Sequence, residues 1–163
     1  MSKLTSSNLI KSSGFAYRTA VFDIPSVNTW VDVPLDAGNK NLINISHNIG
    51  VNPERMTFGI SGNFEMIFKV NCFLNTVPRQ MVMRVFKNNT SEILGSHTQE
   101  SITNANENAS IVGFASDTFA VNDYITLQVG TNGVVTNELQ VYDDPGLPNP
   151  VTSLTASMFV RMI

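Results

Sequence analysis

The chain has 163 residues, a length typical of one ordinary domain. Only 14% of the residues are charged, well below the roughly 25% of an average globular domain, while 42% are hydrophobic. Asparagine, serine and threonine, 48 residues together, take the place of the missing charge. This composition excludes coiled coils and helical bundles, which need many charged helix formers, and the frequent large apolar residues exclude a disordered chain.

The charges of the chain are scattered. The formal net charge is −3, and the ten Lys and Arg residues form no cluster. Nucleic-acid binding needs a basic face that neutralises phosphates, so we expect no nucleic-acid partner. No run of 18 apolar residues occurs, and the first residues lack the apolar segment of a secretion signal. We therefore expect no membrane span, and synthesis and folding in a cytoplasm.

The first 14 residues predict an arm outside the core, because they are polar, rich in serine and without periodicity. We expect a neighbouring subunit or another protein to hold this arm. Its apolar residues Leu4, Leu9 and Ile10 are the candidate anchors of the arm on its partner. The domain itself is expected to span residues 15–163.

Beyond residue 14 the apolar residues recur with a period of two, and no segment has the 3.6-residue period of a helix. The clearest alternation covers residues 63–74, where Phe64, Met66 and Phe68 begin one apolar face and Ile67 interrupts the other, polar face. This pattern predicts a strand with one face in a core and a second face that is partly covered. Further strands are predicted at 30–35, 42–49, 56–60, 80–87, 124–130, 139–142 and 154–163.

Turn residues separate the predicted strands. Residues 87–90 and 131–133 contain Asn and Gly, which tolerate the positive φ of hairpin tips, and residues 121–123 predict a tight turn. Residues 143–150 contain three prolines, which lack ladder donors, so this segment is expected to be a surface loop. Many short strands at regular spacing predict an all-β sandwich or barrel.

The last predicted strand, residues 154–163, carries apolar side chains on both faces. Met158 belongs to one face, and Phe159, Arg161 and Ile163 belong to the other. We expect one face to meet the sandwich core and the other a partner subunit. The four residues are together the candidate subunit interface. The alternative is a central strand covered by loops of its own chain.

The order of several short motifs resembles that of C1q/TNF-like jelly-roll domains. Phe15-Ala16-Tyr17 and residues 30–36 resemble the opening strands of that family, and residues 62–70 are similar to its Gly-x-Tyr core strand. Residues 82–89 look like its strand before a Lys-Asn-Gly hairpin, residues 120–127 like its Ala-Gly-Asp turn, and residues 155–160 like its final strand. Asn89, Asn122 and Ser157 stand where the family has glycine.

The resemblance implies an all-β, antiparallel jelly-roll β-sandwich that assembles as a homotrimer around a threefold axis. Members of the family include secreted ligands, bacterial surface proteins, and virion components of viruses and phages. None of the family's metal ligands matches this sequence, so the resemblance implies neither a metal nor a cofactor.

Residues that commonly carry catalysis or metal binding are sparse. The two histidines, His47 and His97, are fifty positions apart, and no nucleophile elbow, zinc-ligand spacing or phosphate-binding loop occurs. His47 is expected in a hydrogen-bonded core or interface position, and Cys72 as a buried thiol. We expect no enzyme activity, no cofactor and no metal.

The proline-rich loop is the best candidate for a ligand site. Asp143, Asp144 and Asn149 supply oxygen atoms of the type that Ca²⁺ prefers, and a solvated loop without a ligand is the alternative.

These expectations describe a non-enzymatic structural virion protein. It would be a homotrimer that decorates a viral or phage capsid, or forms a head fibre, and attaches to another virion protein through its N-terminal arm. A receptor- or glycan-binding knob at a fibre tip is the alternative, and a secreted C1q-like ligand is a third reading. Low charge fits an assembly, because closely packed copies then bury few charges.

Overall fold

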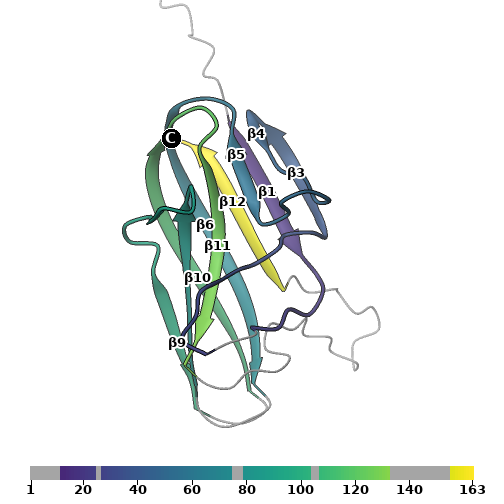
Figure 1. The fold of residues 1–163 in the computed structure, drawn as a ribbon, viewed down its shortest axis with the longest axis vertical. Helices are drawn as coiled ribbons and strands as arrows, with labels where there is room; N and C mark the ends of the chain where they lie inside the picture. The colour runs from purple at the N-terminus through teal and green to yellow at the C-terminus, as the bar shows by residue number, and fades with distance from the viewer. Residues whose placement is uncertain (1–11, 25–26, 75–78, 104–106, 133–154) are drawn as a thin grey trace, which may run out of the picture.

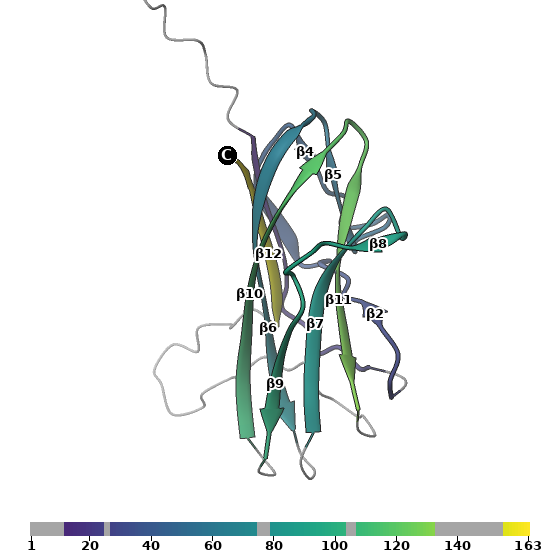
Figure 2. The same ribbon diagram turned by 90° about the vertical axis from the view of Figure 1, so that its left-hand side faces the viewer.

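The computed structural model describes residues 12–24, 27–74, 79–103, 107–132 and 155–163, in which twelve strands and no helix occur. The strands form two sheets that lie face to face, a two-layer sandwich (Figures 1 and 2). One sheet has five strands, in the order β10 (Glu107–Phe119), β6 (Gly62–Leu74), β12 (Ala156–Met162), β1 (Ser13–Arg18) and β3 (Gly38–Ile43). The second sheet has the order β4 (Ile45–Ser46), β5 (Arg55–Phe58), β11 (Tyr124–Thr131), β7 (Arg79–Lys87) and β8 (Ser91–Glu92); β2 (Val31–Asp32) joins β11, and β9 (Thr98–Ile102) joins β7.

All ladders between these strands are antiparallel, so the expected antiparallel β-sandwich is confirmed. β12 lies between β6 and β1, which places the last described strand beside the first one (Figure 1). β1 begins at Ser13, and Ser12 is already buried, so the sheet starts two residues before the expected domain boundary at residue 15.

The core lies between the two sheets and follows the predicted alternation. Phe64, Met66, Phe68 and Val70 of β6 are buried, and they face an inner layer from the opposite sheet that includes Met83. Cys72 is a buried thiol, as expected. Aromatic stacking strengthens one end of this core, where the rings of Phe58 and Phe119 lie 3.9 Å apart and that of Phe64 contacts both.

The predicted strand at residues 42–49 is interrupted. Asn44 has a φ of 55°, a left-handed conformation that ends β3 and turns the chain into the two-residue β4. As a result Ile45 and His47 are buried, whereas Ile43 and Ile49 are exposed. The strand predicted at residues 30–35 is likewise reduced to β2, because proline at position 34 cannot donate to a ladder.

The sequence patterns did not predict β10, the long edge strand that pairs with β6 over thirteen residues. Its inward positions include Gly113 and Ala115, and its outward positions include Val112 and Phe114, both exposed. Apolar and polar residues therefore do not alternate along β10, although the strand itself is regular.

Candidate functional site

The outer face of the five-stranded sheet carries a row of four large apolar side chains, which we call the apolar row. Its members are paired across adjacent strands: Phe114 of β10 with Ile67 of β6, Ile67 with Phe159 of β12, and Phe159 with Phe15 of β1. Directly paired residues on one face of a sheet lie about 5 Å apart, so the row is continuous across four strands. It faces away from the core that the same strands bury on their other side.

The apolar row is open to solvent. Phe114 is 65% exposed and Ile67 is 39% exposed, while Phe15 and Phe159 are partly exposed. Tyr17 extends the row along β1, because its ring stacks on that of Phe15 with centroids 5.6 Å apart. Contiguous exposed apolar surface of this kind marks an interaction site more often than a solvated face.

Polar residues border the apolar row on one side. Arg161 of β12 pairs in register with Glu65 of β6, and their side chains form an ion pair next to Phe159 and Ile67. An open hollow of about 580 Å³ lies over this ion pair and beside Phe114. Leu94, in the loop between β8 and β9, lines the hollow and is 95% exposed. The sheet face thus combines an apolar strip, one ion pair and a projecting apolar side chain.

Three of the four residues predicted for a subunit interface are at or near this face. Phe159 belongs to the apolar row, Arg161 lies next to it, and Ile163, just beyond β12, is 67% exposed. The prediction was wrong for Met158, which is completely buried in the core and has no surface left for a partner.

The other members of the row were not predicted from the sequence. Ile67 could have been identified from the sequence, since it interrupts the polar face of the predicted strand at residues 63–74. Phe114 could not, because β10 was not predicted. Two other predicted sites lie outside the described residues: the arm anchors Leu4, Leu9 and Ile10, and the loop residues Asp143, Asp144 and Asn149.

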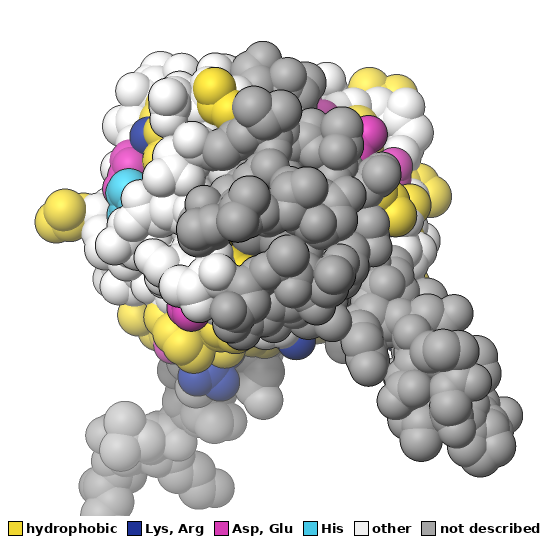
Figure 3. Space-filling model, turned by 90° about the horizontal axis from the view of Figure 1, so that it is seen from below, with side chains coloured by type: hydrophobic (Ala, Val, Ile, Leu, Met, Phe, Trp, Pro, Cys, Tyr) yellow, Lys and Arg dark blue, Asp and Glu magenta, His cyan; other side chains and the backbone are white. Residues whose placement is uncertain are grey.

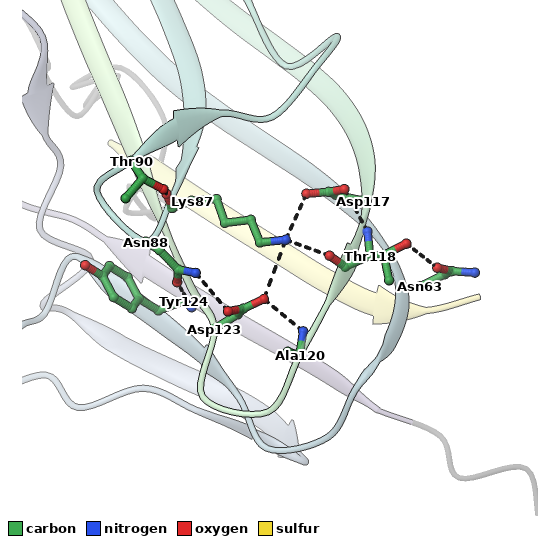
Figure 4. Close-up of polar contacts among 9 residues, drawn as sticks. All are labelled: Asn63, Lys87, Asn88, Thr90, Asp117, Thr118, Ala120, Asp123 and Tyr124. Carbon is green, nitrogen blue, oxygen red and sulfur yellow. Dashed lines mark hydrogen bonds and ion pairs between the residues drawn. The ribbon is translucent and has the colours of Figure 1, made fainter.

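A charged network ties the β7–β8 turn to the β10–β11 turn (Figure 4). Lys87 lies 3.3 Å from Asp117 and 3.5 Å from Asp123, donates to the carbonyl of Thr118, and covers the ring of Phe119. Asp123 accepts hydrogen bonds from the backbone N–H of Ala120 and from the Asn88 amide, both at 2.8 Å.

These contacts lower the pKa of Asp123 from its ordinary value. The hydrogen bond from the Ala120 N–H lowers the pKa most, followed by the hydrogen bond from the Asn88 amide. Burial raises the pKa, and the charge of Lys87 lowers it further. Lys87 contacts Asp117, Asp123 and the Thr118 carbonyl at once, so the network holds the two turns together.

His47 is buried and hydrogen-bonded, as predicted. Its Nε2 lies 2.9 Å from the carbonyl of Pro53 and its Nδ1 lies 3.2 Å from the Asn39 amide, so Nε2 donates and Nδ1 accepts. His97 contacts the edge of Trp30 in a separate environment. The two histidines therefore do not meet in one site.

Trp30 lines an open hollow of about 290 Å³ at the end of the sandwich where β11 ends. Uncharged polar residues such as Asn28, Gln80 and Asn132 line the same hollow. Arg84 covers the Trp30 ring at 4.1 Å and fixes its orientation.

The described residues contain no group of three or more metal-ligating side chains. Within the same ranges, no helix is long and apolar enough to cross a membrane. Seen from below, the described charged side chains lie among uncharged ones and form no broad patch of one sign (Figure 3).

No family model matches the sequence, and no curated protein matches it. Among solved structures, the chain is similar to Eiger TNF from S. frugiperda, with a TM-score of 0.58 and 8% identity over 94% of this chain and 92% of that chain. At this identity the similarity shows the fold alone, and it confirms the expected architecture: the chain folds as a TNF-like jelly-roll β-sandwich.

Proposed function

We propose that the chain is a non-enzymatic structural protein that acts as a homotrimer on the surface of a virion. The observation that carries this proposal is the apolar row. Burial of apolar surface stabilises an assembly by about 25 cal/mol per Å², so an exposed strip of three phenylalanines and one isoleucine favours association. The C1q/TNF-like resemblance implies three copies around an axis.

The position of the row suits a closed ring. Phe114 lies on the edge strand β10 and Phe15 on β1, next to the opposite edge, so the row runs from one edge across most of the sheet. A copy that packs its edge, including Leu94, against the sheet face of the next copy makes a heterologous contact. Such contacts close into a ring when the rotation between copies is a third of a turn.

The virion part of the proposal rests on composition. A chain with only 14% charged residues and abundant Asn, Ser and Thr lets copies pack closely without burying unpaired charges. The arm with Leu4, Leu9 and Ile10 supplies the attachment to a shell protein. Imaging purified particles by electron microscopy tests this placement, because a decoration protein is then found on the shell. Deletion of residues 1–11, which leaves Ser12 and β1 in place, should abolish shell binding by the intact trimer, and unchanged binding would exclude the role of the arm.

Sedimentation tests the trimer directly. We expect the purified chain to sediment as a trimer at micromolar concentration and the variant Phe114→Glu to sediment as a monomer, because a carboxylate cannot be buried in the row without a partner. Phe114 is 65% exposed, so the substitution leaves the core intact. Val51→Glu, an exposed apolar residue away from the row, is the matched control and should remain trimeric. A monomeric wild-type chain would contradict the proposal.

The Trp30 hollow favours a second candidate function, a receptor- or glycan-binding knob. Aromatic rings and amides are suited to the apolar and hydroxyl faces of sugars, and the orientation of Trp30 is fixed before binding. A glycan array with wild type and Trp30→Ala distinguishes the two functions. Specific binding that the substitution removes supports the knob, and absence of binding supports decoration alone.

A further inference from the structure

A second hollow, of about 260 Å³, opens at the opposite end of the seven-stranded sheet, and we call it the Arg55 hollow. Arg55 of β5 and Tyr124 of β11 line it together with Asn48, Asn52 and Asn122. Tyr124 is paired with the residue two positions after Arg55, so the two side chains are diagonal neighbours on adjacent strands. Arg55 is the only charged residue in its lining, which otherwise consists of polar, aromatic and small apolar groups.

The guanidinium of Arg55 is held in place by two contacts. Its Cζ lies 4.5 Å above the ring of Tyr124, and its Nε lies 3.1 Å from a carboxylate oxygen of Glu54. The geometry of the second contact is that of an ion pair without a hydrogen bond, so the buried Nε has no acceptor among the described residues. A guanidinium stacked on an aromatic ring has lost much of its rotamer freedom before any ligand arrives.

The terminal nitrogens of Arg55 are available to a ligand. Its side chain is 33% exposed, and within the described residues no acceptor is hydrogen-bonded to Nη1 or Nη2. The contact with Glu54 is made by Nε, so it does not use the edge formed by the two Nη atoms. That edge carries parallel N–H donors whose spacing matches the two oxygens of a carboxylate.

The rest of the lining supplies hydrogen bonds to neutral groups. Asn48 uses its side-chain oxygen to accept from the N–H groups of Gly50 and Val51, so its NH₂ group remains as a donor. Both ring nitrogens of His47 are already hydrogen-bonded within the chain, so this histidine lines the hollow in a fixed orientation. A ligand that fits these features combines one carboxylate with several hydroxyl groups.

We propose that the Arg55 hollow binds an acidic monosaccharide unit, with the carboxylate on the Nη edge of Arg55 and the sugar hydroxyls on the surrounding amides. This inference depends neither on the trimer nor on the virion role. The hollow is slightly smaller than the 300 Å³ at which pockets for drug-sized ligands begin, which suits a single sugar ring.

The test is an NMR titration of the full chain with glucuronate as the probe. We expect shifts of the backbone amides of Asn122 and Tyr124 with glucuronate, and none with glucose or with the methyl ester of glucuronate, which lack the charge. Acetate should bind at least several-fold more weakly than glucuronate, because it has no hydroxyl groups. Equal binding of acetate would overturn the sugar part of the proposal, and equal binding of the ester would overturn the role of the carboxylate.

Two substitutions locate the site. Arg55→Gln should weaken glucuronate binding at least tenfold. Arg55→Lys should weaken it less, since lysine keeps the positive charge but lacks the parallel N–H donors of the guanidinium. Lys40→Gln, which removes one exposed positive charge from β3, is the matched control and should leave binding unchanged. Shifts confined to another part of the wild-type chain, or no shift at millimolar glucuronate, would refute the proposal even if the Arg55 variants do not fold.

Discussion

Asparagine bends this chain at many of its turns. The non-glycine residues with positive φ in the described ranges number seven, and all are asparagines. An L-residue in this conformation brings Cβ close to a carbonyl oxygen, which asparagine tolerates because its short amide can hydrogen-bond locally. Asn88 and Asn89, with φ of 51° and 52°, form the β7–β8 turn, where the hairpin glycine of related domains was missing from the sequence. The amide-rich composition therefore has a conformational cause as well as a surface role.

Asp123 is the residue whose charge state should matter most for stability. Its pKa is lowered in the folded chain, so its contribution is fully present above the unfolded pKa of about 3.9 and is lost as the pH falls through the lower, folded pKa. We expect Asp123→Asn to reduce the free energy of unfolding by about 1–2 kcal/mol at neutral pH, because one acceptor of a charged hydrogen bond is lost. Urea unfolding between pH 7 and roughly pH 2 measures this difference, which should shrink below about pH 4.

Glu100→Gln is the control for Asp123→Asn. Glu100 is an exposed carboxylate on β9, and its neutralisation should change stability by less than about 0.5 kcal/mol at every pH. A difference between wild type and Asp123→Asn that persists unchanged at low pH would contradict the assignment of the effect to the ionised carboxylate.

At the scale of elements, the pairing of β6 and β10 depends on Gly113. A Cβ at this position would lie 2.2 Å from Cε2 of Phe68, and Phe68 is fully buried and cannot move aside without displacing the core. We expect Gly113→Val to lower the free energy of unfolding by about 3 kcal/mol through overpacking. Denaturant unfolding checks this value against Ser116→Val, an outward-facing change on the same strand, which should cost less than about 1 kcal/mol. Equal stability of the two variants would contradict the packing argument.

The same strand explains how far the sequence could predict the fold. β6 follows a plain alternation because its inward side chains are large, and this pattern was recognised. β10 places Gly113, which has no apolar side chain, toward the core, and Phe114, a residue type typical of cores, toward solvent. The alternation expected of a strand is therefore hidden. The sandwich and one member of the apolar row, Phe159, were therefore predictable, but the complete row was not, since it exists only through the register of four strands. The Arg55 hollow likewise depends on the pairing of β5 with β11.

At the scale of the whole molecule, association and folding should be linked. If copies bury the apolar row, the assembled state is favoured by mass action, and the midpoint of thermal unfolding should rise with protein concentration. Calorimetry over a roughly hundredfold range of concentration measures this dependence. The Phe114→Glu variant should unfold at a lower temperature that does not vary with concentration. A wild-type midpoint independent of concentration would show that each copy is stable alone.

The position of β12 has a consequence for the order of events during synthesis. A ribosome makes β12 after all the other described strands, yet β12 lies between β6 and β1 and supplies Phe159 to the middle of the apolar row. Until β12 has emerged, the edges of β6 and β1 that it joins are therefore unpaired, and the apolar row lacks Phe159. If copies associate through the apolar row, as proposed, a complete row is available only after translation has reached this point, and unfinished chains on neighbouring ribosomes should not assemble through it.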